Sequence, residues 1–98
     1  MGQLFYSPLS RRDLSQIWDY IAGDNPEAAD RVLRQIDAQC RQLARSPELG
    51  ERWPELSPLI RMFTVGRYAV FYRTVEDGIE VARILHSARD IPAVFGDD

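Results

Sequence analysis

The only histidine of this 98-residue chain lies between two arginines near the C-terminal end. Arg83, His86 and Arg89 belong to the stretch RILHSARD, where an apolar run that predicts the last β-strand comes to an end. Histidine can serve as a general acid or base, and guanidinium groups beside it would lower its pKa and stabilise negative charge on a phosphate. Cleavage of RNA also needs a base, and Glu80 lies about 20 Å from His86 along the predicted strand. A histidine that caps a strand end is therefore the simpler interpretation.

Two predicted turns bring a second group of chemically versatile residues together. Gly66–Arg67 suits a two-residue turn of type II′ and Asp77–Gly78 one of type I′, which predicts an antiparallel meander of three strands. In the register that these turns impose, Arg61 faces Tyr72, and Tyr72 faces Arg83. Guanidinium forks bind phosphate or carboxylate and stack on aromatic rings, so this row predicts a site for an anionic ligand. The alternatives are a solvated sheet face, or a bulged second turn that shifts the last strand by one residue.

The candidate residues form one set for binding and a smaller one for catalysis. The predicted binding residues are Arg61, Tyr72, Arg73, Arg83, His86 and Arg89. No catalytic residue is expected unless the chain is a ribonuclease, in which case Arg61, Arg83 and His86 would serve. One cysteine and one histidine provide no set of metal ligands, and no glycine-rich phosphate loop occurs, so we expect neither a metal nor a cofactor. Cys40 lies on an apolar helix face and is assigned to the core.

The elements that would position these residues are two helices followed by strands. A serine–proline pair at Ser7 predicts the start of a helix that runs to about Ala22, and the stretch GDNP predicts the start of a second helix that runs to about Arg45. Apolar residues recur at helical spacing in both, so the helices should pack as an antiparallel hairpin. The expected fold is α+β in a single domain, 1–98. An N-terminal strand precedes the hairpin at about 8–45, which packs on the sheet at about 59–86, and a C-terminal tail follows at 87–98.

Composition restricts the kinds of partner. All 12 basic residues are arginines against 15 acidic ones, giving a net charge of −3, although residues 61–89 carry a small basic surplus. An acidic protein neutralises few phosphates, so we expect a protein partner rather than direct sequence-specific binding of nucleic acid. No apolar run approaches the length of a membrane span, and the N-terminus lacks a signal pattern. A single cysteine fits a reducing compartment, and the expected location is the cytoplasm, with no membrane partner.

Several stretches together resemble a known family. SPLSRRDLSQIWDYIAGDNPEAADRVLRQID, SPELG, RYAVFYR and VARILHSARD, in this order, resemble the ParE branch of the RelE/ParE toxin superfamily, over about Ser7 to Phe95. The family comprises toxins of type II toxin–antitoxin modules, also called plasmid stabilisation proteins. The resemblance implies a strand, a helical hairpin and an antiparallel sheet. It also implies a cognate antitoxin whose C-terminal segment lies across the toxin.

The resemblance leaves the target open between two activities. ParE-type members poison DNA gyrase, block replication and arrest growth, whereas RelE-type members cut messenger RNA on the ribosome. Nuclease members use a basic cluster that includes lysine, so the absence of lysine and of a base near His86 favours gyrase as the target. Arg83 and His86 nevertheless fall where nuclease members place functional residues, which keeps a ribosome-dependent endoribonuclease as the alternative. A toxin without activity, acting only in antitoxin-mediated repression, is the third interpretation.

Overall fold

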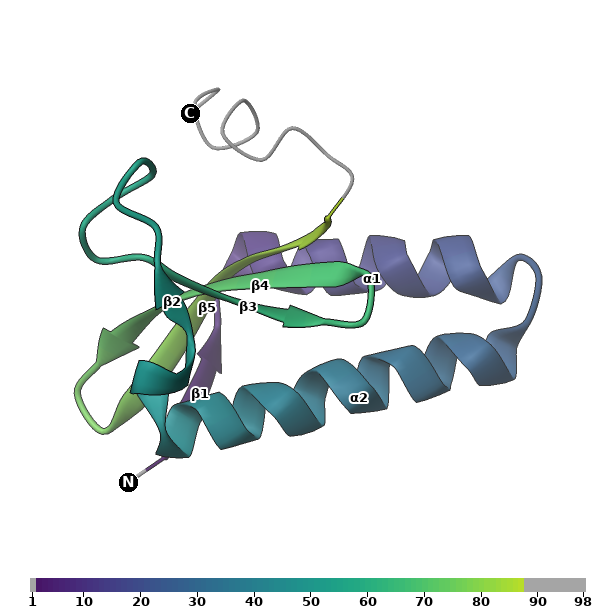
Figure 1. Cartoon of the computed structure of the whole chain (residues 1–98). Helices are drawn as coiled ribbons and strands as arrows, with labels where there is room; N and C mark the ends of the chain where they lie inside the picture. The colour runs from purple at the N-terminus through teal and green to yellow at the C-terminus, as the bar shows by residue number, and fades with distance from the viewer. Residues whose placement is uncertain (1, 88–98) are drawn as a thin grey trace.

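The computed structural model describes residues 2–87, in which a pair of helices packs against one face of a five-stranded sheet (Figure 1). The order of strands across the sheet is β1-β5-β4-β3-β2; β1 is parallel to β5, and the other neighbours are antiparallel. The elements are β1 (Gln3–Tyr6), α1 (Pro8–Ala22), α2 (Pro26–Arg45), a 3₁₀ turn (Pro47–Leu49), β2 (Glu51–Arg52), β3 (Arg61–Val65), β4 (Tyr68–Val75) and β5 (Gly78–His86). The predicted α+β fold with a helical hairpin is confirmed; the short β2 was not predicted.

Both helices begin as the capping residues predict. The Ser7 hydroxyl accepts a hydrogen bond from the Ser10 N–H, and the Asn25 side chain accepts from the N–H groups of Glu27 and Ala28. A proline occupies the first turn of each helix, where a missing N–H donor costs nothing. Neither helix of the described chain combines the length and apolar character that crossing a bilayer requires.

The main core lies between α2 and the sheet. It contains the fully buried residues Ile36, Cys40, Leu43, Val70, Tyr72, Ile79 and Val81. Burial raises the pKa of the Cys40 thiol to about 11, so near neutral pH it stays protonated and unreactive, as a core residue. On the opposite face of the sheet, Ala69, Phe71 and Leu85 form a second cluster, on which Trp53 packs edge-on against Phe71 with the ring centroids 5.4 Å apart. Trp53 thus covers part of this face of the sheet.

The register agrees with the sequence pattern between β3 and β4 but not between β4 and β5. Arg61 faces Tyr72 as predicted. The second turn, however, consists of Glu76–Asp77, and a bulge interrupts the pairing near Tyr72, so that Tyr72 faces Val81 and Arg83 faces Phe71. The predicted row of Arg61, Tyr72 and Arg83 is therefore wrong beyond its first pair. The alternative of a bulged second turn correctly expected the alignment to break but placed the cause wrongly, because the turn has two residues and the bulge lies between Phe71 and Tyr72.

Gly78 explains why the sequence pattern placed the second turn one residue too late. A Cβ atom built on Gly78 would lie 1.8 Å from the Gln3 carbonyl oxygen, so this glycine is needed where β1 approaches β5. Its backbone has no positive φ; the turn residue in the left-handed region is Asp77, at 67°. Glycine thus serves close backbone approach here rather than turn geometry.

Replacing Gly78 with alanine should separate β1 from β5. The added methyl group has no space, and overpacking of this kind should lower the free energy of unfolding by at least about 2 kcal/mol. Denaturant unfolding of Gly78→Ala against wild type measures the effect. Gly23→Ala is the matched control, because its Cβ would meet nothing closer than 3.5 Å, and its unfolding free energy should change by less than about 0.5 kcal/mol. Equal stability of the two variants would contradict the assigned role.

Candidate functional site

A cleft of about 750 Å³ opens between the helical hairpin and the end of the sheet that carries the β3–β4 turn. In Figure 1 the hairpin extends past the sheet on this side. The cleft is lined from α1 by Asp13, Gln16, Ile17, Tyr20 and Ile21, from α2 by Val32, Gln35 and Ile36, and from the sheet by Val65–Tyr68 and Ile84–His86. Its size is typical of binding clefts in proteins.

The cleft has an apolar interior and a polar rim. Ile17 and Val32 present aliphatic surface from the two helices, and Tyr20, 85 % exposed, contributes a large aromatic ring that the described residues leave open to solvent. Arg67 supplies positive charge from the β3–β4 turn. An apolar groove with polar edges suits an amphipathic polypeptide segment, because alternate side chains of that segment can be buried while its polar groups stay at the rim.

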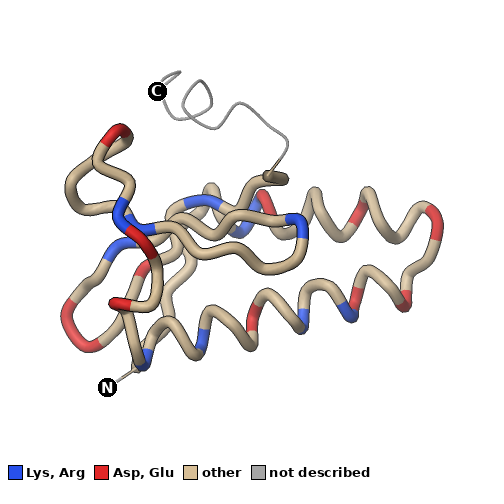
Figure 2. The backbone as a smooth tube through the Cα atoms, viewed as in Figure 1, with Lys and Arg blue, Asp and Glu red and all other residues tan. Residues whose placement is uncertain are grey.

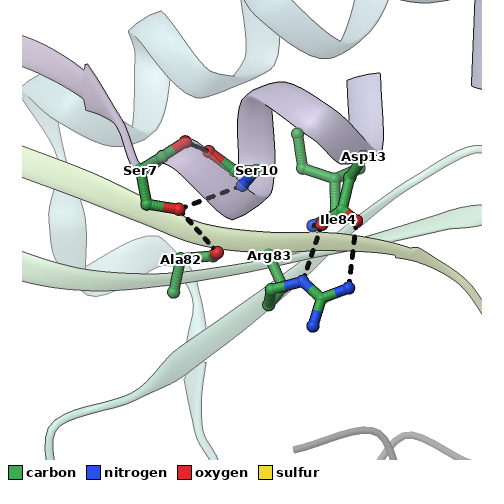
Figure 3. Close-up of polar contacts among 6 residues, drawn as sticks. All are labelled: Ser7, Ser10, Asp13, Ala82, Arg83 and Ile84. Carbon is green, nitrogen blue, oxygen red and sulfur yellow. Dashed lines mark hydrogen bonds and ion pairs between the residues drawn. The ribbon is translucent and has the colours of Figure 1, made fainter. Parts of the chain in front are cut away.

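The Asp13 carboxylate, which lines the cleft, links α1 to β5. Figure 3 shows its contacts with Arg83 and Ile84. The carboxylate accepts hydrogen bonds from Arg83 Nε at 2.8 Å and Nη2 at 3.0 Å, and one oxygen also accepts from the Ile84 N–H at 2.9 Å. Only 16 % of the Arg83 side chain and 6 % of the Asp13 side chain are exposed. Nearby, the Ser7 hydroxyl donates to the Ala82 carbonyl oxygen at 2.8 Å. These bonds hold the first turns of α1 against β5.

Most of the predicted arginines of the site have contacts within the fold. Arg61 Nη1 donates to the Gly50 carbonyl oxygen at 2.7 Å, and Arg73 forms an ion pair with Glu80 at 2.9 Å on the exposed sheet face. With the fork of Arg83 on Asp13, the guanidinium groups are held by different partners and form no common anion site. The binding role of each residue stays a prediction, but the structure does not bring Arg61, Arg73 and Arg83 together around one ligand.

Tyr72 lies in the core. It is fully buried, and its hydroxyl donates to the Pro47 carbonyl oxygen and accepts from the Gly50 N–H. Burial raises the pKa of Tyr72, so the hydroxyl stays protonated and ties the segment after α2 to the sheet. Arg61 Nη1 donates to the carbonyl oxygen of the same residue, Gly50, so Tyr72 and Arg61 together hold the loop after α2 against the sheet.

His86 is the predicted site residue that lines the cleft. Its ring packs edge-on against Tyr68, with the centroids 5.6 Å apart. Arg89 lies outside the described residues, as does the tail at 88–98. Sequence reasoning missed Asp13, Gln16 and Tyr20, which occupy the wall and mouth of the cleft. The one local signal was the apolar stripe of the first helix, which pointed to the core and not to an open groove.

Removing the charge of Asp13 should weaken the attachment of α1 to β5. In Asp13→Asn the amide oxygen can still accept from the Ile84 N–H, but the mostly buried Arg83 loses its anionic partner, which should cost about 2–4 kcal/mol of unfolding free energy. Glu80→Gln removes the partner of Arg73 in a far more exposed pair and should cost less than about 1 kcal/mol. Urea unfolding of both variants measures these losses. A loss of less than about 1 kcal/mol of unfolding free energy in Asp13→Asn would contradict a structural role for the Asp13–Arg83 pair.

Comparison with known proteins agrees with this architecture. Residues 4–91 match the family model described as ParE toxin of type II toxin-antitoxin system, parDE. Toxin RelE3 of Caulobacter vibrioides is 35 % identical over 88 residues, which cover 89 % of this chain and 96 % of that protein. Toxin ParE1 of the same organism is 33 % identical over 92 residues, covering 90 % and 95 %, and its Toxin ParE3 is 26 % identical over 97 residues, covering 98 % and 97 %.

A solved structure supports the fold independently. The chain titled chromosomal ParDE TA system from P. aeruginosa superposes with a TM-score of 0.72 at 24 % identity, covering 86 % of this chain and 94 % of that one. The match to the family model spans nearly all of the sequence, and two relatives exceed 30 % identity over most of both chains. The chain therefore belongs to the ParE toxin family of type II toxin–antitoxin systems.

Proposed function

We propose that this toxin inhibits DNA gyrase through protein–protein contacts, blocks replication, and is neutralised by a cognate antitoxin whose segment occupies the cleft between the helical hairpin and the sheet. The observation that carries the proposal is the contrast between the predicted arginine row and the cleft. The guanidinium groups of Arg61 and Arg83 are engaged by the protein's own carbonyl and carboxylate oxygens. The cleft, by contrast, is open, apolar inside and polar at its rim.

The same contrast argues against a ribonuclease centre. A ribonuclease built on the predicted set needs Arg61, Arg83 and His86 around one phosphate, with a base within hydrogen-bond reach of the attacking hydroxyl. Arg83 pairs opposite Phe71 on β4, whereas His86 lies at the cleft against Tyr68. Glu80, the acid considered from the sequence, forms an ion pair with Arg73. Action by protein contacts requires none of these residues to converge.

Ribosome-dependent cleavage of messenger RNA is the second candidate function, and one observation favours it. His86 and Tyr68 form an edge-on aromatic pair at the mouth of the cleft, where Arg67 also lies. A titratable ring, an aromatic face and a cation in one place could contact a nucleotide by proton transfer, stacking and charge. If this function is correct, His86→Gln should abolish transcript cleavage in induced cells.

Purified gyrase provides the direct test of the first function. Supercoiling of relaxed plasmid should fall as the toxin is added, and preincubation with the antitoxin encoded beside it should restore supercoiling. Induction in a bacterium should cause filamentation and DNA damage while translated transcripts stay intact. If supercoiling is undiminished and transcripts are cut inside codons, gyrase inhibition is rejected and ribosome-dependent cleavage of messenger RNA is supported. A chain that is harmless on induction without its antitoxin would indicate a role confined to repression.

The exposed tyrosine at the mouth of the cleft should be important for antitoxin capture. In Tyr20→Ala the chain loses a large aromatic contact whose side chain is already 85 % exposed, so the fold should be unaffected while antitoxin affinity falls by at least about tenfold. Leu59→Ala is the matched control, since Leu59 is 70 % exposed and does not line the cleft. Calorimetric titration of both variants with the antitoxin measures the difference. Equal affinities would place the antitoxin elsewhere.

A further inference from the structure

The side of α2 that faces away from the cleft carries a separate surface. A shallow depression of about 600 Å³ lies there, and among residues 2–87 its lining comes from α2 alone: Asp30, Leu33, Arg34, Asp37, Ala38 and Arg41. The cleft uses other residues of the same helix, Val32, Gln35 and Ile36, which lie on the opposite side at 3.6 residues per turn. Figure 2 shows basic and acidic positions interspersed along α2. The outer face of α2 therefore combines charges of both signs with two apolar side chains, Leu33 and Ala38.

The order of these charges is symmetric about a point on the helix. Asp30, Arg34, Asp37 and Arg41 follow one another at spacings of four, three and four residues, which places them in one stripe along the helix. The midpoint between positions 34 and 37 is also the midpoint between positions 30 and 41. If a second α2 lies antiparallel across that midpoint, each arginine meets an aspartate of the other copy.

We propose that a second copy of this chain docks on this face, with the two α2 helices antiparallel about a two-fold axis. Arg34 then pairs with the partner's Asp37, and Arg41 with the partner's Asp30, and each pair occurs twice. Two-fold interfaces require a surface that is complementary to itself, and the alternation of sign along this stripe meets that requirement. A purely acidic or purely basic partner would meet two repelling residues for every two attracting ones.

The side chains between the charges allow close approach. Leu33 and Ala38 flank the stripe, and the small Ala38 is exposed, so apolar contact can accompany the ion pairs. Helices that pack through small and medium side chains have axes about 8–10 Å apart. The stripe from Asp30 to Arg41 spans about 16 Å at 1.5 Å per residue, so the contact is about three helical turns long. This size fits a weak, concentration-dependent dimer.

Existing contacts leave the four charges available to a second copy. Asp37 accepts from the Tyr6 hydroxyl and from Arg41 Nε, and Asp30 accepts from the indole N–H of Trp18, all at 2.8 Å. A carboxylate has about four acceptor positions, so each can accept a further guanidinium group. Arg34 has no ion pair within residues 2–87. Because the charges are exposed to solvent, the dimer should weaken steeply as salt is added.

Charge exchange within one chain tests the proposal. Sedimentation equilibrium of the full-length toxin in about 50 mM salt should show a monomer–dimer equilibrium that shifts toward monomer in about 500 mM salt. Arg41→Glu places an acid opposite the partner's Asp30 and should raise the dissociation constant at least about tenfold. Adding Asp30→Arg to that variant reverses both signs, leaves the Tyr6–Asp37 bond intact, and should restore dimerisation to within about threefold of wild type.

The controls separate this contact from a general effect of charge. Arg12→Glu makes the same change of net charge on an exposed position of α1 and should leave the dissociation constant unchanged. Circular dichroism checks that each variant is folded. A wild-type chain that stays monomeric up to about 1 mM protein at low salt overturns the proposal, as does an Arg41→Glu variant whose loss is not recovered by Asp30→Arg. The test needs no antitoxin and no gyrase, so its outcome is independent of the proposed function.

Discussion

The unequal lengths of β1 and β5 are the constraint on which the structure depends. β1 pairs only with Gly78–Val81, so within residues 2–87 the second half of β5 has no neighbouring strand on that side. Peptide groups left there without partners would cost free energy and would expose a strand edge. Polar side chains of the first helix take the place of the missing strand: Ser7 donates to the Ala82 carbonyl oxygen and Asp13 accepts from the Ile84 N–H. The helix thus rests on the strand edge, and Arg83 adds the ion pair that holds Asp13 there.

The fold could be predicted from the sequence wherever the determining signals were local. Serine–proline and asparagine–proline caps, with apolar residues at helical spacing, sufficed for both helices, and the Gly66–Arg67 turn fixed the register of β3 and β4. The prediction of the β4–β5 register was wrong because this register depends on β1. Gly78 is required by the Gln3 carbonyl group, which approaches from a strand 75 positions away, so a glycine that suited a turn belonged to a strand contact. No pattern within the hairpin itself distinguishes these two uses.

The candidate site was harder to predict than the fold for a related reason. Arginine and tyrosine drew attention because their chemistry suits anionic ligands, yet the same groups also satisfy buried carbonyl and carboxylate oxygens. The partner of Arg83 lies 70 positions earlier in the chain, and the Tyr72 hydroxyl binds a loop that precedes the sheet. The cleft is formed instead by residues that read as ordinary core or surface positions, because its walls are the ends of elements that meet only after folding.

The two sides of α2 allow two kinds of association at once. The inner side contributes Val32 and Ile36 to the cleft, and the outer side carries the alternating charges. A partner in the cleft and a second copy on the outer side can therefore be bound at the same time. A two-fold axis across the outer side would relate two clefts by 180° and leave both open. A partner that carries two copies of its binding segment could then engage both, and its second contact would form at the high effective concentration set by the first. Self-association at α2 would in this way strengthen antitoxin capture without any new contact in the cleft.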